Sequence, residues 1–381
     1  MKKNSFVLAL SFLGFCTLLY GQKIPSPKLS LAQSENLIFL DSETNQNRKV
    51  KFSAKFTPDG CKKTNTSWSI TGIPGKDWKI VSGSLENDVV ELEFKNIGNY
   101  SLELTTVYTY SGDDPEEPEE DEISIEKEVA VTVTKNLDEL TQIHADSNYL
   151  KLVKKASSYL VKPEYSTDPT PNIFLAKGYY GIYKKELDDP VVSDPWAATI
   201  DCIAAAVELD YNGVYNVNIH KIWLNKFQNE LLTNEILNNM DEEEGFYIPY
   251  SGDNKDLKIE YQDLSLEGCE IYASITKYPI SIKLMEAALR YNARDSRTAN
   301  AIWKNEIPNL EKLTENDFEE MTETDLLALK YGAIISAISL TESSSSNIQA
   351  CQMLNSLKKV YEYDRGFSAF LKTRYNNCKE E

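Results

Sequence analysis

The pattern of apolar and polar positions changes once along this chain, near residue 135. Between residues 34 and 135, apolar and polar residues alternate in short runs, and this period of two predicts half-buried β-strands. Turn sequences such as Pro58-Asp59-Gly60 and Pro74-Gly75 separate the runs. The predicted strands are 49–56, 66–71, 78–83, 89–94, 100–110 and 126–134. The sequence therefore predicts an all-β domain over 34–135.

After residue 137 the apolar residues recur every three to four positions, which predicts amphipathic helices. Pairs of such helices joined by short loops are the building unit of an α-solenoid. We therefore expect an α-helical repeat domain over 136–381. The predicted helices are 137–160, 172–187, 196–209, 214–238, 261–276, 279–291, 296–306, 322–340, 347–362 and 364–375.

One spacing of residues occurs twice in the helical half. Residues 210–225 read DYNGVYNVNIHKIWLN, and residues 290–305 read RYNARDSRTANAIWKN. A scaffold repeats its building block, whereas an enzyme rarely repeats its active site. We expect each tyrosine to pack at a turn and each tryptophan to lie on the inner face of the following helix. The matching pairs are Tyr211 and Tyr291, Asn212 and Asn292, Ile222 and Ile302, Trp223 and Trp303, and Asn225 and Asn305.

The β half resembles the latter part of a PKD domain, a family with an immunoglobulin-like sandwich fold. The resemblance rests on WSI at 68–70 and on FKNIGNYSLEL at 94–104. That family pairs a buried tryptophan with a phenylalanine, a Gly-x-Tyr turn and an alternating final strand. The family's Trp-Asp-Phe-Gly-Asp-Gly stretch is absent. The resemblance implies a buried Trp68 and a role as a spacer or adhesion module.

The helical half resembles tetratricopeptide repeats. The stretch AAVELDYNG at 205–213 is similar to the end of the second helix of such a repeat, and AAL at 287–289 precedes the second copy. The loop at 187–195 is longer than the family's turn, and AKGYY at 176–180 only echoes its first-helix pattern. The resemblance implies a superhelix that binds another protein.

The first 21 residues have the pattern of a secretory signal peptide. Lys2 and Lys3 precede an apolar run at 6–19 that is too short to span a bilayer, and Gly21 offers a cleavage point. Phe15 precedes Cys16 where a lipoprotein signal requires a small residue. We expect residues 22–33 to be a linker and the mature chain to have no transmembrane span.

Charge and composition narrow the location and the partners. The chain has 40 basic and 59 acidic residues and a net charge of −19, which disfavours binding to nucleic acid or anionic lipid. The Lys-, Asn-, Glu- and Tyr-rich composition resembles that of exported Bacteroidota proteins. This resemblance implies the periplasm or the periplasmic face of the outer membrane, with secretion as the alternative.

Motifs for catalysis and metal binding are not found. The two histidines, His144 and His220, form no metal-binding spacing, and neither a nucleophile elbow nor a phosphate loop is present. We therefore expect no catalytic residue, no metal and no cofactor. The acidic run at 112–126 fits a calcium site or a solvated hairpin tip, and its Glu and Pro content favours the tip.

The cysteines allow a disulfide in an oxidising compartment. Beyond Cys16, the chain contains five cysteines, so at least one thiol stays unpaired. Cys351 and Cys378 are a possible pair. Cys202 and Cys269 lie in apolar helical settings typical of inert buried thiols.

Aromatic residues are the candidates for partner binding. Tyr179, Tyr180 and Tyr183 lie together on one predicted helix and fit either a peptide-binding groove or packing between repeats. Trp223 and Trp303 complete the candidate set. We expect a non-enzymatic periplasmic or outer-membrane-associated scaffold that binds a protein of the cell-envelope, secretion or gliding machinery.

Two alternatives involve sugars. A carbohydrate-binding module requires an exposed Trp68 or Trp78 as a stacking platform. A polysaccharide-acting protein requires two facing carboxylates in a tyrosine-rich cleft.

Overall fold

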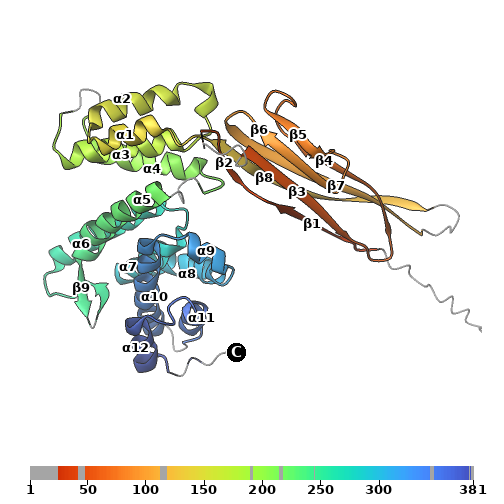
Figure 1. Ribbon diagram of the computed structural model, residues 1–381. Helices are drawn as coiled ribbons and strands as arrows, with labels where there is room; N and C mark the ends of the chain where they lie inside the picture. The colour runs from red at the N-terminus through yellow and green to blue at the C-terminus, as the bar shows by residue number, and fades with distance from the viewer. Residues whose placement is uncertain are drawn as a thin grey trace, which may run out of the picture.

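A computed structural model describes residues 25–41, 48–111, 118–188, 192–213, 218–243, 245–343, 347–376 and 378. The predicted two-part architecture is confirmed: a β-rich part is followed by a helical part (Figure 1). The predicted signal peptide lies outside the described residues, as do residues 112–117 of the acidic run.

The β-rich part consists of two four-stranded sheets with strand orders β1-β3-β6-β5 and β2-β8-β7-β4. All pairs are antiparallel except β2 with β8, which is parallel. The strands are β1 (Lys28–Gln33), β2 (Leu37–Phe39), β3 (Lys49–Thr57), β4 (Lys62–Ile70), β5 (Trp78–Gly83), β6 (Val89–Phe94), β7 (Gly98–Tyr110) and β8 (Glu119–Thr134).

Three features of this part differ from the sequence prediction. Strand β1 lies in the predicted linker at 22–33, because its alternating residues pair with β3. The three-residue β2 is too short to show a period. Strand β8 begins at Glu119, so the second half of the acidic run pairs with β7 instead of forming a hairpin tip.

The space between the two sheets is filled by alternate residues of the strands. Phe52 and Leu92 from one sheet meet Trp68 and Leu104 from the other in one buried cluster. Trp68 is 4% exposed and Trp78 is 3% exposed. Their Nε1 atoms donate hydrogen bonds to backbone carbonyls, at 2.6 Å and 2.9 Å. Neither tryptophan can therefore serve as a sugar-stacking platform.

The helical part contains helices close to the predicted ones, with small differences at their ends. The predicted helix 137–160 is broken at Ser147, which has a φ of 56°. Its helices are α1 (Asp138–Ala145), α2 (Tyr149–Leu160), α3 (Thr170–Lys184), α4 (Pro195–Leu209), α5 (Asn218–Leu231), α6 (Lys255–Ser274), α7 (Ile280–Asn292), α8 (Ser296–Leu310), α9 (Glu315–Glu320), α10 (Glu323–Ser343), α11 (Ile348–Leu357) and α12 (Arg365–Arg374).

An element that the sequence did not predict is the short hairpin of β9 (Met240–Glu243) and β10 (Phe246–Pro249). It follows a π-helical turn, η4 (Leu232–Ile236), and a 3₁₀ turn, η5 (Leu237–Asn239), which end the long helix predicted at 214–238.

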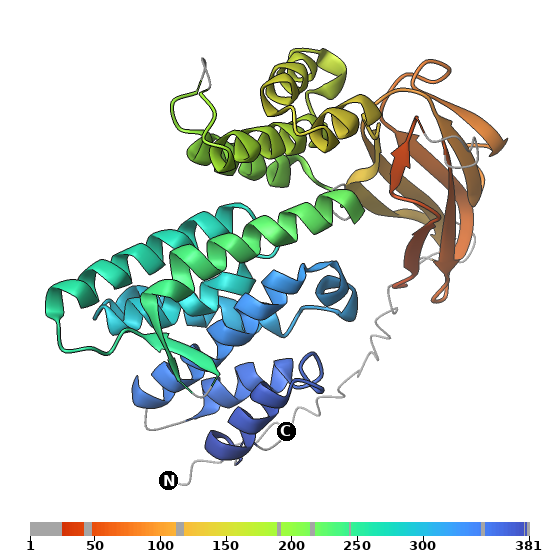
Figure 2. The same ribbon diagram turned by 60° about the vertical axis from the view of Figure 1, so that its left-hand side comes forward.

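The helical part has two hydrophobic cores, and α3 contributes to both. Phe174 and Tyr179 join a core made with α1 and α2, whereas Ile173 and Tyr180 join a larger core made with α4–α12. Helices α5 and α6 lie between the α1–α4 group and the remaining helices (Figure 1, Figure 2). Helix α10 is apolar enough over 323–342 to cross a membrane by length and composition, but 67% of this stretch is buried in the larger core.

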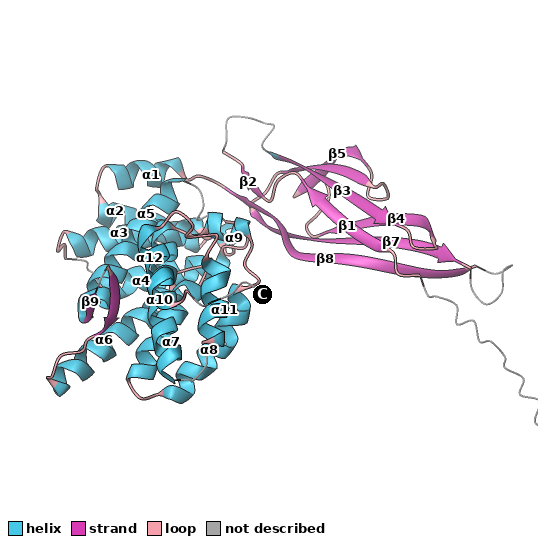
Figure 3. Ribbon diagram, turned by 90° about the horizontal axis from the view of Figure 1, so that it is seen from below, coloured by secondary structure: helices cyan, strands magenta, loops and turns pink. Residues whose placement is uncertain are grey.

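Polar contacts join the β-rich part to the start of α3. The Asp168 carboxylate accepts hydrogen bonds from Thr134 Oγ1 at 2.6 Å and from the Thr170 backbone N–H at 2.9 Å. Asn212 Nδ2 donates to Thr132 Oγ1 at 2.9 Å. Figure 3 shows β8 running along the β-rich part toward the helices. The end of β8 is therefore hydrogen-bonded to one residue just before α3 and to another just after α4.

The two copies of the duplicated spacing have different surroundings. In the second copy, Trp303 is buried, donates to Ser336 Oγ at 2.8 Å, and lies 5.9 Å from Tyr291 between ring centroids. In the first copy, Tyr211 is 53% exposed, next to the Asn212 that contacts the β-rich part. The packing prediction is wrong for Tyr211, because its turn lies between the β-rich part and Lys277 of the helical part, where Tyr211 lines an open pocket.

A disulfide bond joins Cys351 of α11 to Cys378, which follows α12, with an S–S distance of 1.99 Å. Of the described free cysteines, Cys269 is fully buried and Cys202 is partly buried. Burial raises the pKa of the Cys202 thiol to about 12, so this thiol is inert at neutral pH.

We expect the double variant C351S/C378S to unfold with a free energy about 3–4 kcal/mol smaller than that of the parent. The disulfide closes a loop between residues 27 apart in sequence, and the closed loop reduces the entropy of the unfolded chain. Urea unfolding followed by circular dichroism measures the difference, with C61S as the cysteine control. Equal midpoints for the parent and the double variant would contradict this expectation.

Candidate functional site

A pocket of about 390 Å³ lies among α1, α2, α3 and α5. It combines aromatic side chains with several lysines and one glutamate. Its lining residues are His144, Tyr149, Lys177, Tyr180, Gly181, Lys184, Lys185, Trp223, Lys226 and Glu230. We call it the α3–α5 pocket.

The helical period places the lining residues on facing sides of two helices. Residues 177, 180–181 and 184 recur every three to four positions along α3, and 223, 226 and 230 do so along α5. Contacts join Lys177 to His220, and both Tyr180 and Lys184 to Glu230. Residue numbers rise together in these pairs, so the two helices run side by side in the same direction.

Gly181 is required for the packing of the pocket's α2 wall. A Cβ atom at this position would lie 2.2 Å from the Cδ1 atom of Tyr149, so the Tyr149 ring rests on bare backbone. At Gly178, a Cβ atom would lie 2.7 Å from Val153 Cγ2. The two glycines of the AKGYYG stretch therefore allow α2 to approach α3 closely.

The structure brings Tyr180 and Trp223, two of the candidate binding residues, together. Their ring centroids are 5.9 Å apart with an interplanar angle of 80°. Phe227 packs behind both, at 5.2 Å from Tyr180 and 5.7 Å from Trp223. These rings form an aromatic wall on one side of the α3–α5 pocket. Aromatic edges and faces of this kind bind apolar and aromatic groups.

The other three candidates lie elsewhere. Tyr179 is buried in the core shared with α1 and α2, and Trp303 is 1% exposed in the larger core. Neither residue is in the lining of the pockets that contain Tyr180, Tyr183 and Trp223. Tyr183 is 45% exposed and packs against Trp196 with ring centroids 5.1 Å apart.

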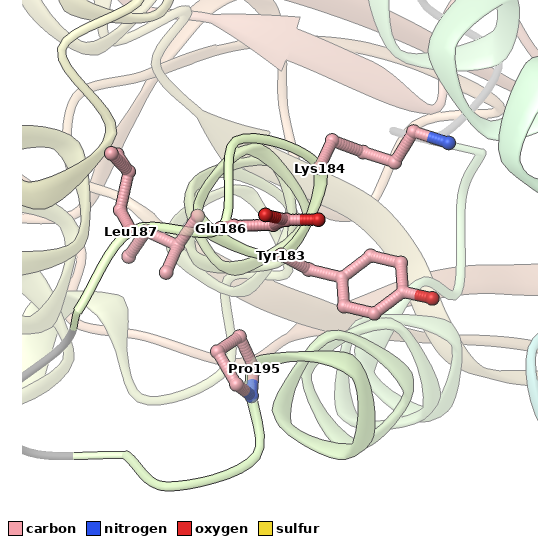
Figure 4. A pocket seen from close by; sticks show the side chains of 6 residues that line it. Tyr183, Lys184, Glu186, Leu187 and Pro195 are labelled. Carbon is pink, nitrogen blue, oxygen red and sulfur yellow. The ribbon is translucent and has the colours of Figure 1, made fainter.

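Tyr183 lines a second pocket, of about 400 Å³, together with Ile182, Lys184, Glu186, Leu187 and Pro195. Figure 4 shows Tyr183 and Lys184 leaving the end of α3 toward one side and Leu187 toward the other. Because Lys184 lines both pockets, the end of α3 is accessible from two directions.

The α3–α5 pocket is basic, although the protein is strongly acidic. Four lysines and one glutamate line it, whereas the whole chain has a net charge of −19. Glu230 accepts hydrogen bonds from Lys184 Nζ at 2.7 Å and from the Tyr180 hydroxyl. Burial raises the pKa of Glu230, but these two hydrogen bonds outweigh it and the pKa is lowered. Glu230 is therefore ionised and already bound.

Lys177 is a buried cation in this pocket. Lys177 is 1% exposed, and its Nζ atom donates a hydrogen bond to Nδ1 of His220 at 2.9 Å. The same Nζ lies 5.2 Å from the ring centroid of Phe174 and 5.8 Å from that of Trp223, which is within cation–π range. Among the described residues, no carboxylate forms an ion pair with it. A buried ammonium group without a counter-ion is costly.

Burial sets the protonation states of this pair. It lowers the pKa of Lys177 to about 8, and burial together with the Lys177 charge lowers the pKa of His220 to about 3. Burial and Lys177 also lower the pKa of His144. At pH 7, Lys177 is therefore mostly charged, and Nδ1 of the neutral His220 ring accepts the hydrogen bond from its Nζ atom.

The chemistry available here is binding of an anionic group, with apolar contacts beside it. Among the described residues, no group of His, Cys, Asp and Glu side chains could hold a metal ion. Each pocket beside α3 has a single carboxylate in its lining, Glu230 in one and Glu186 in the other. Neither pocket therefore contains the facing carboxylates that glycoside hydrolysis requires.

Lys177 and Lys226 are not among the candidates named from the sequence, and His220 is named there only as a histidine without metal-binding spacing. The sequence does mark Lys177 as unusual, because it is the one charged residue between 170 and 183 in a mostly apolar helix. A lone lysine in an apolar helix either reaches solvent with its ammonium group or is buried together with a polar partner. Only the positions of α1 and α5 distinguish the two cases.

No protein-family model matches this chain, and no curated protein matches it. Two solved structures are similar to it: methylamine-reacted α-2-macroglobulin from Salmonella and trypsin-activated α-2-macroglobulin from Escherichia coli. Both are 10% identical over 93% of this chain, with TM-scores of 0.19 and 0.16. The chain spans 27% of the length of each macroglobulin. At these TM-scores the similarity carries no argument about fold or function.

We expect the double variant K177M/H220F to be at least as stable as the parent at pH 7. It removes a buried charge and both partners of one hydrogen bond, and apolar groups of similar size replace them. The parent should gain about 2 kcal/mol of unfolding free energy between pH 7 and pH 9.5, relative to the variant.

The direction of this change in unfolding free energy with pH follows from the lowered pKa of Lys177. Its pKa is about 8 in the folded protein against an ordinary 10.5, so the unfolded chain binds more protons across this window and stability rises with pH. Urea unfolding at the two pH values measures both effects. A variant that is much less stable at pH 7 and shows the parent's pH dependence would contradict the assignment of Lys177 as a costly buried charge.

Proposed function

We propose that the protein is an exported, non-enzymatic scaffold whose helical part binds a partner protein of the cell envelope. The observation that carries this proposal is the α3–α5 pocket, in which Tyr180 and Trp223 meet in a basic recess of an acidic protein. Aromatic anchors in partly enclosed recesses dominate the binding energy of many protein interfaces.

Export to the periplasm, or to the periplasmic face of the outer membrane, is part of the proposal. The signal-peptide pattern of the first 21 residues supports it, as does the Cys351–Cys378 disulfide, which is stable in an oxidising compartment. The partner would belong to the envelope, secretion or gliding machinery, and secretion of the protein itself is the alternative.

We further propose that the β-rich part is an immunoglobulin-like, PKD-like sandwich. The two strand orders agree with an immunoglobulin arrangement in which the first two strands, β1 and β2, are edge strands of opposite sheets. A buried Trp68 on β4 supports it. So does Tyr100, near the start of β7, whose hydroxyl donates to the Asn96 carbonyl at 2.9 Å, as in a tyrosine corner. Such a domain would act as the spacer or adhesion module.

For the helical part, we propose a relationship to tetratricopeptide repeats. The hairpin of α7 and α8 supports it, because the buried Ala287 and Ala288 precede the turn and Trp303 fills the inner face of the second helix. The separate core of α1–α3 and the β9–β10 hairpin depart from a uniform array of repeats.

The alternative is a carbohydrate-binding or polysaccharide-acting protein that uses the same tyrosine-lined wall. Tyrosine and tryptophan rings also stack on sugar faces, so Tyr149, Tyr180 and Trp223 favour this second candidate. The burial of Trp68 and Trp78 and the single carboxylate in each pocket beside α3 weigh against it.

We expect the tagged mature protein to co-purify with one envelope protein in stoichiometric amount from detergent-solubilised envelopes, as identified by mass spectrometry. The W223A variant should lose this partner, because Trp223 forms the aromatic wall of the α3–α5 pocket. Y363A is the matched control, since Tyr363 is 91% exposed and lies outside this pocket. The purified partner should likewise bind the parent and Y363A but not W223A.

Circular dichroism establishes that each variant is folded. A partner that W223A retains would place its binding elsewhere and contradict the role of the pocket. Absence of any protein partner, with binding on a glycan array that W223A abolishes, would replace the scaffold proposal with the carbohydrate alternative.

A further inference from the structure

Lys177 gives the α3–α5 pocket a buried positive charge. Its ammonium is buried at the pocket and bound to a neutral imidazole, His220. A neutral imidazole satisfies one donor of the ammonium but does not neutralise its charge. Among the described residues, the positive charge on Lys177 is therefore uncompensated, and an anionic group placed beside it would remove this cost.

The rest of the pocket limits the size of the negative charge. The rim lysines Lys184, Lys185 and Lys226 attract an anion. Glu230 of α5 is bound to Tyr180 and Lys184, which lie one and two helical turns from Lys177 along α3. Two turns of helix span roughly 11 Å. Glu230 already accepts two hydrogen bonds at that end, so the buried charge left without a counter-ion is that of Lys177, and one carboxylate is enough to compensate it.

The aromatic wall specifies what carries the carboxylate. The Trp223 ring centroid lies 5.8 Å from the Lys177 Nζ atom, Tyr180 packs against Trp223 and bonds to Glu230, and Tyr149 lines the same pocket. The pocket volume of about 390 Å³ is at the lower end of the range for small-ligand sites. It has room for a carboxylate together with one aromatic or branched apolar side chain.

We propose that the α3–α5 pocket recognises a carboxylate adjacent to an aromatic side chain on a peptide segment of the partner, and that Lys177, held by His220, is the residue that binds the carboxylate. The proposal deepens the scaffold function and rests on it for the partner being a protein. The carboxylate comes either from an aspartate or glutamate side chain or from a chain terminus.

Three capped dipeptides serve as probes: acetyl-Asp-Phe-amide, acetyl-Ala-Phe with a free carboxylate, and the neutral acetyl-Ala-Phe-amide. Isothermal titration calorimetry on the full mature protein should give at least tenfold tighter binding for one or both acids than for the neutral amide. The tighter acid identifies the source of the carboxylate. Inorganic phosphate and glucuronate are tested in parallel and should bind more weakly.

Two variants separate Lys177 from general electrostatics. K177M/H220F should bind the acids no better than the neutral amide. K226M is the matched control on the rim of the same pocket; it should change the affinity for the acids about twofold or less and lower its dependence on salt. Equal affinity of the parent for acids and amide, or an acid preference that survives in K177M/H220F, would overturn the proposal.

The pH dependence provides a second readout. Affinity for the acids should fall as pH rises from 7 to 9.5, because Lys177 loses its proton in this window. The other titratable groups around Lys177 are His144 on α1, Tyr149 on α2, Tyr180 and Lys184 on α3, Lys185 after it, and His220, Lys226 and Glu230 on α5. K226M should keep the fall, and an affinity that is constant over this range would overturn the role of Lys177.

The outcomes also separate this proposal from the scaffold function. If the probes show no acid preference while W223A still loses an envelope protein, the scaffold stands and the carboxylate assignment fails. If the acids bind as expected but no protein partner is found, the carboxylate site stands and the scaffold fails. Tighter binding of glucuronate than of either dipeptide acid would overturn the peptide assignment.

Discussion

The structure depends on the burial of α3 from all sides. Every residue from Thr170 to Ile182 is buried, because one face of the helix packs on α1 and α2 while the other packs on α4 and α5. Gly178 and Gly181 make this possible by letting α2 approach the backbone. A helix in this position has no solvent-facing side for a charged residue. Lys177 is therefore carried into the interior, where it meets His220 instead of water.

The β-rich part fixes where α3 begins. Asp168 bonds both to Thr134 at the end of β8 and to the first turn of α3, and Leu37 of β2 packs against the larger helical core. Asn212, from the first copy of the duplicated spacing, adds a hydrogen bond to β8. The spacing that looked like a repeat interface thus serves, in one of its two copies, as part of the contact between the two parts of the chain.

Much of the fold was predictable from periodicity. The six predicted strands and ten predicted helical segments all correspond to elements of the structure, because burial of one face imposes a period on each. The edge strands β1 and β2 were missed, since one lies in a presumed linker and the other has only three residues. The β9–β10 hairpin was missed because MDEE has no apolar alternation.

The site was less predictable than the fold. The structure brings Tyr180 and Trp223 together in the lining of one pocket, whereas Tyr179 and Trp303, which have the same residue types, line neither pocket beside α3. Tyr179 and Tyr180 differ because residues one position apart on a helix face different sides, and Trp223 and Trp303 differ because they are on different helices, α5 and α8. Lys177 and His220 are 43 residues apart in sequence, and nothing in either local stretch indicates that they meet. Their pairing depends on how α5 is placed against α3, which is a property of the tertiary packing.

The function proposed for the α3–α5 pocket requires the charge on Lys177 to be uncompensated until an anionic group enters the pocket. The most direct test is to measure the pKa of the Lys177 amino group by NMR, using labelled lysine and K177M for assignment, before and after saturation with the tighter-binding dipeptide acid. We expect a Lys177 pKa near 8 without the probe and a clear rise toward the ordinary lysine pKa when the carboxylate is bound. An ordinary lysine pKa in the free protein, or no change on binding, would contradict it.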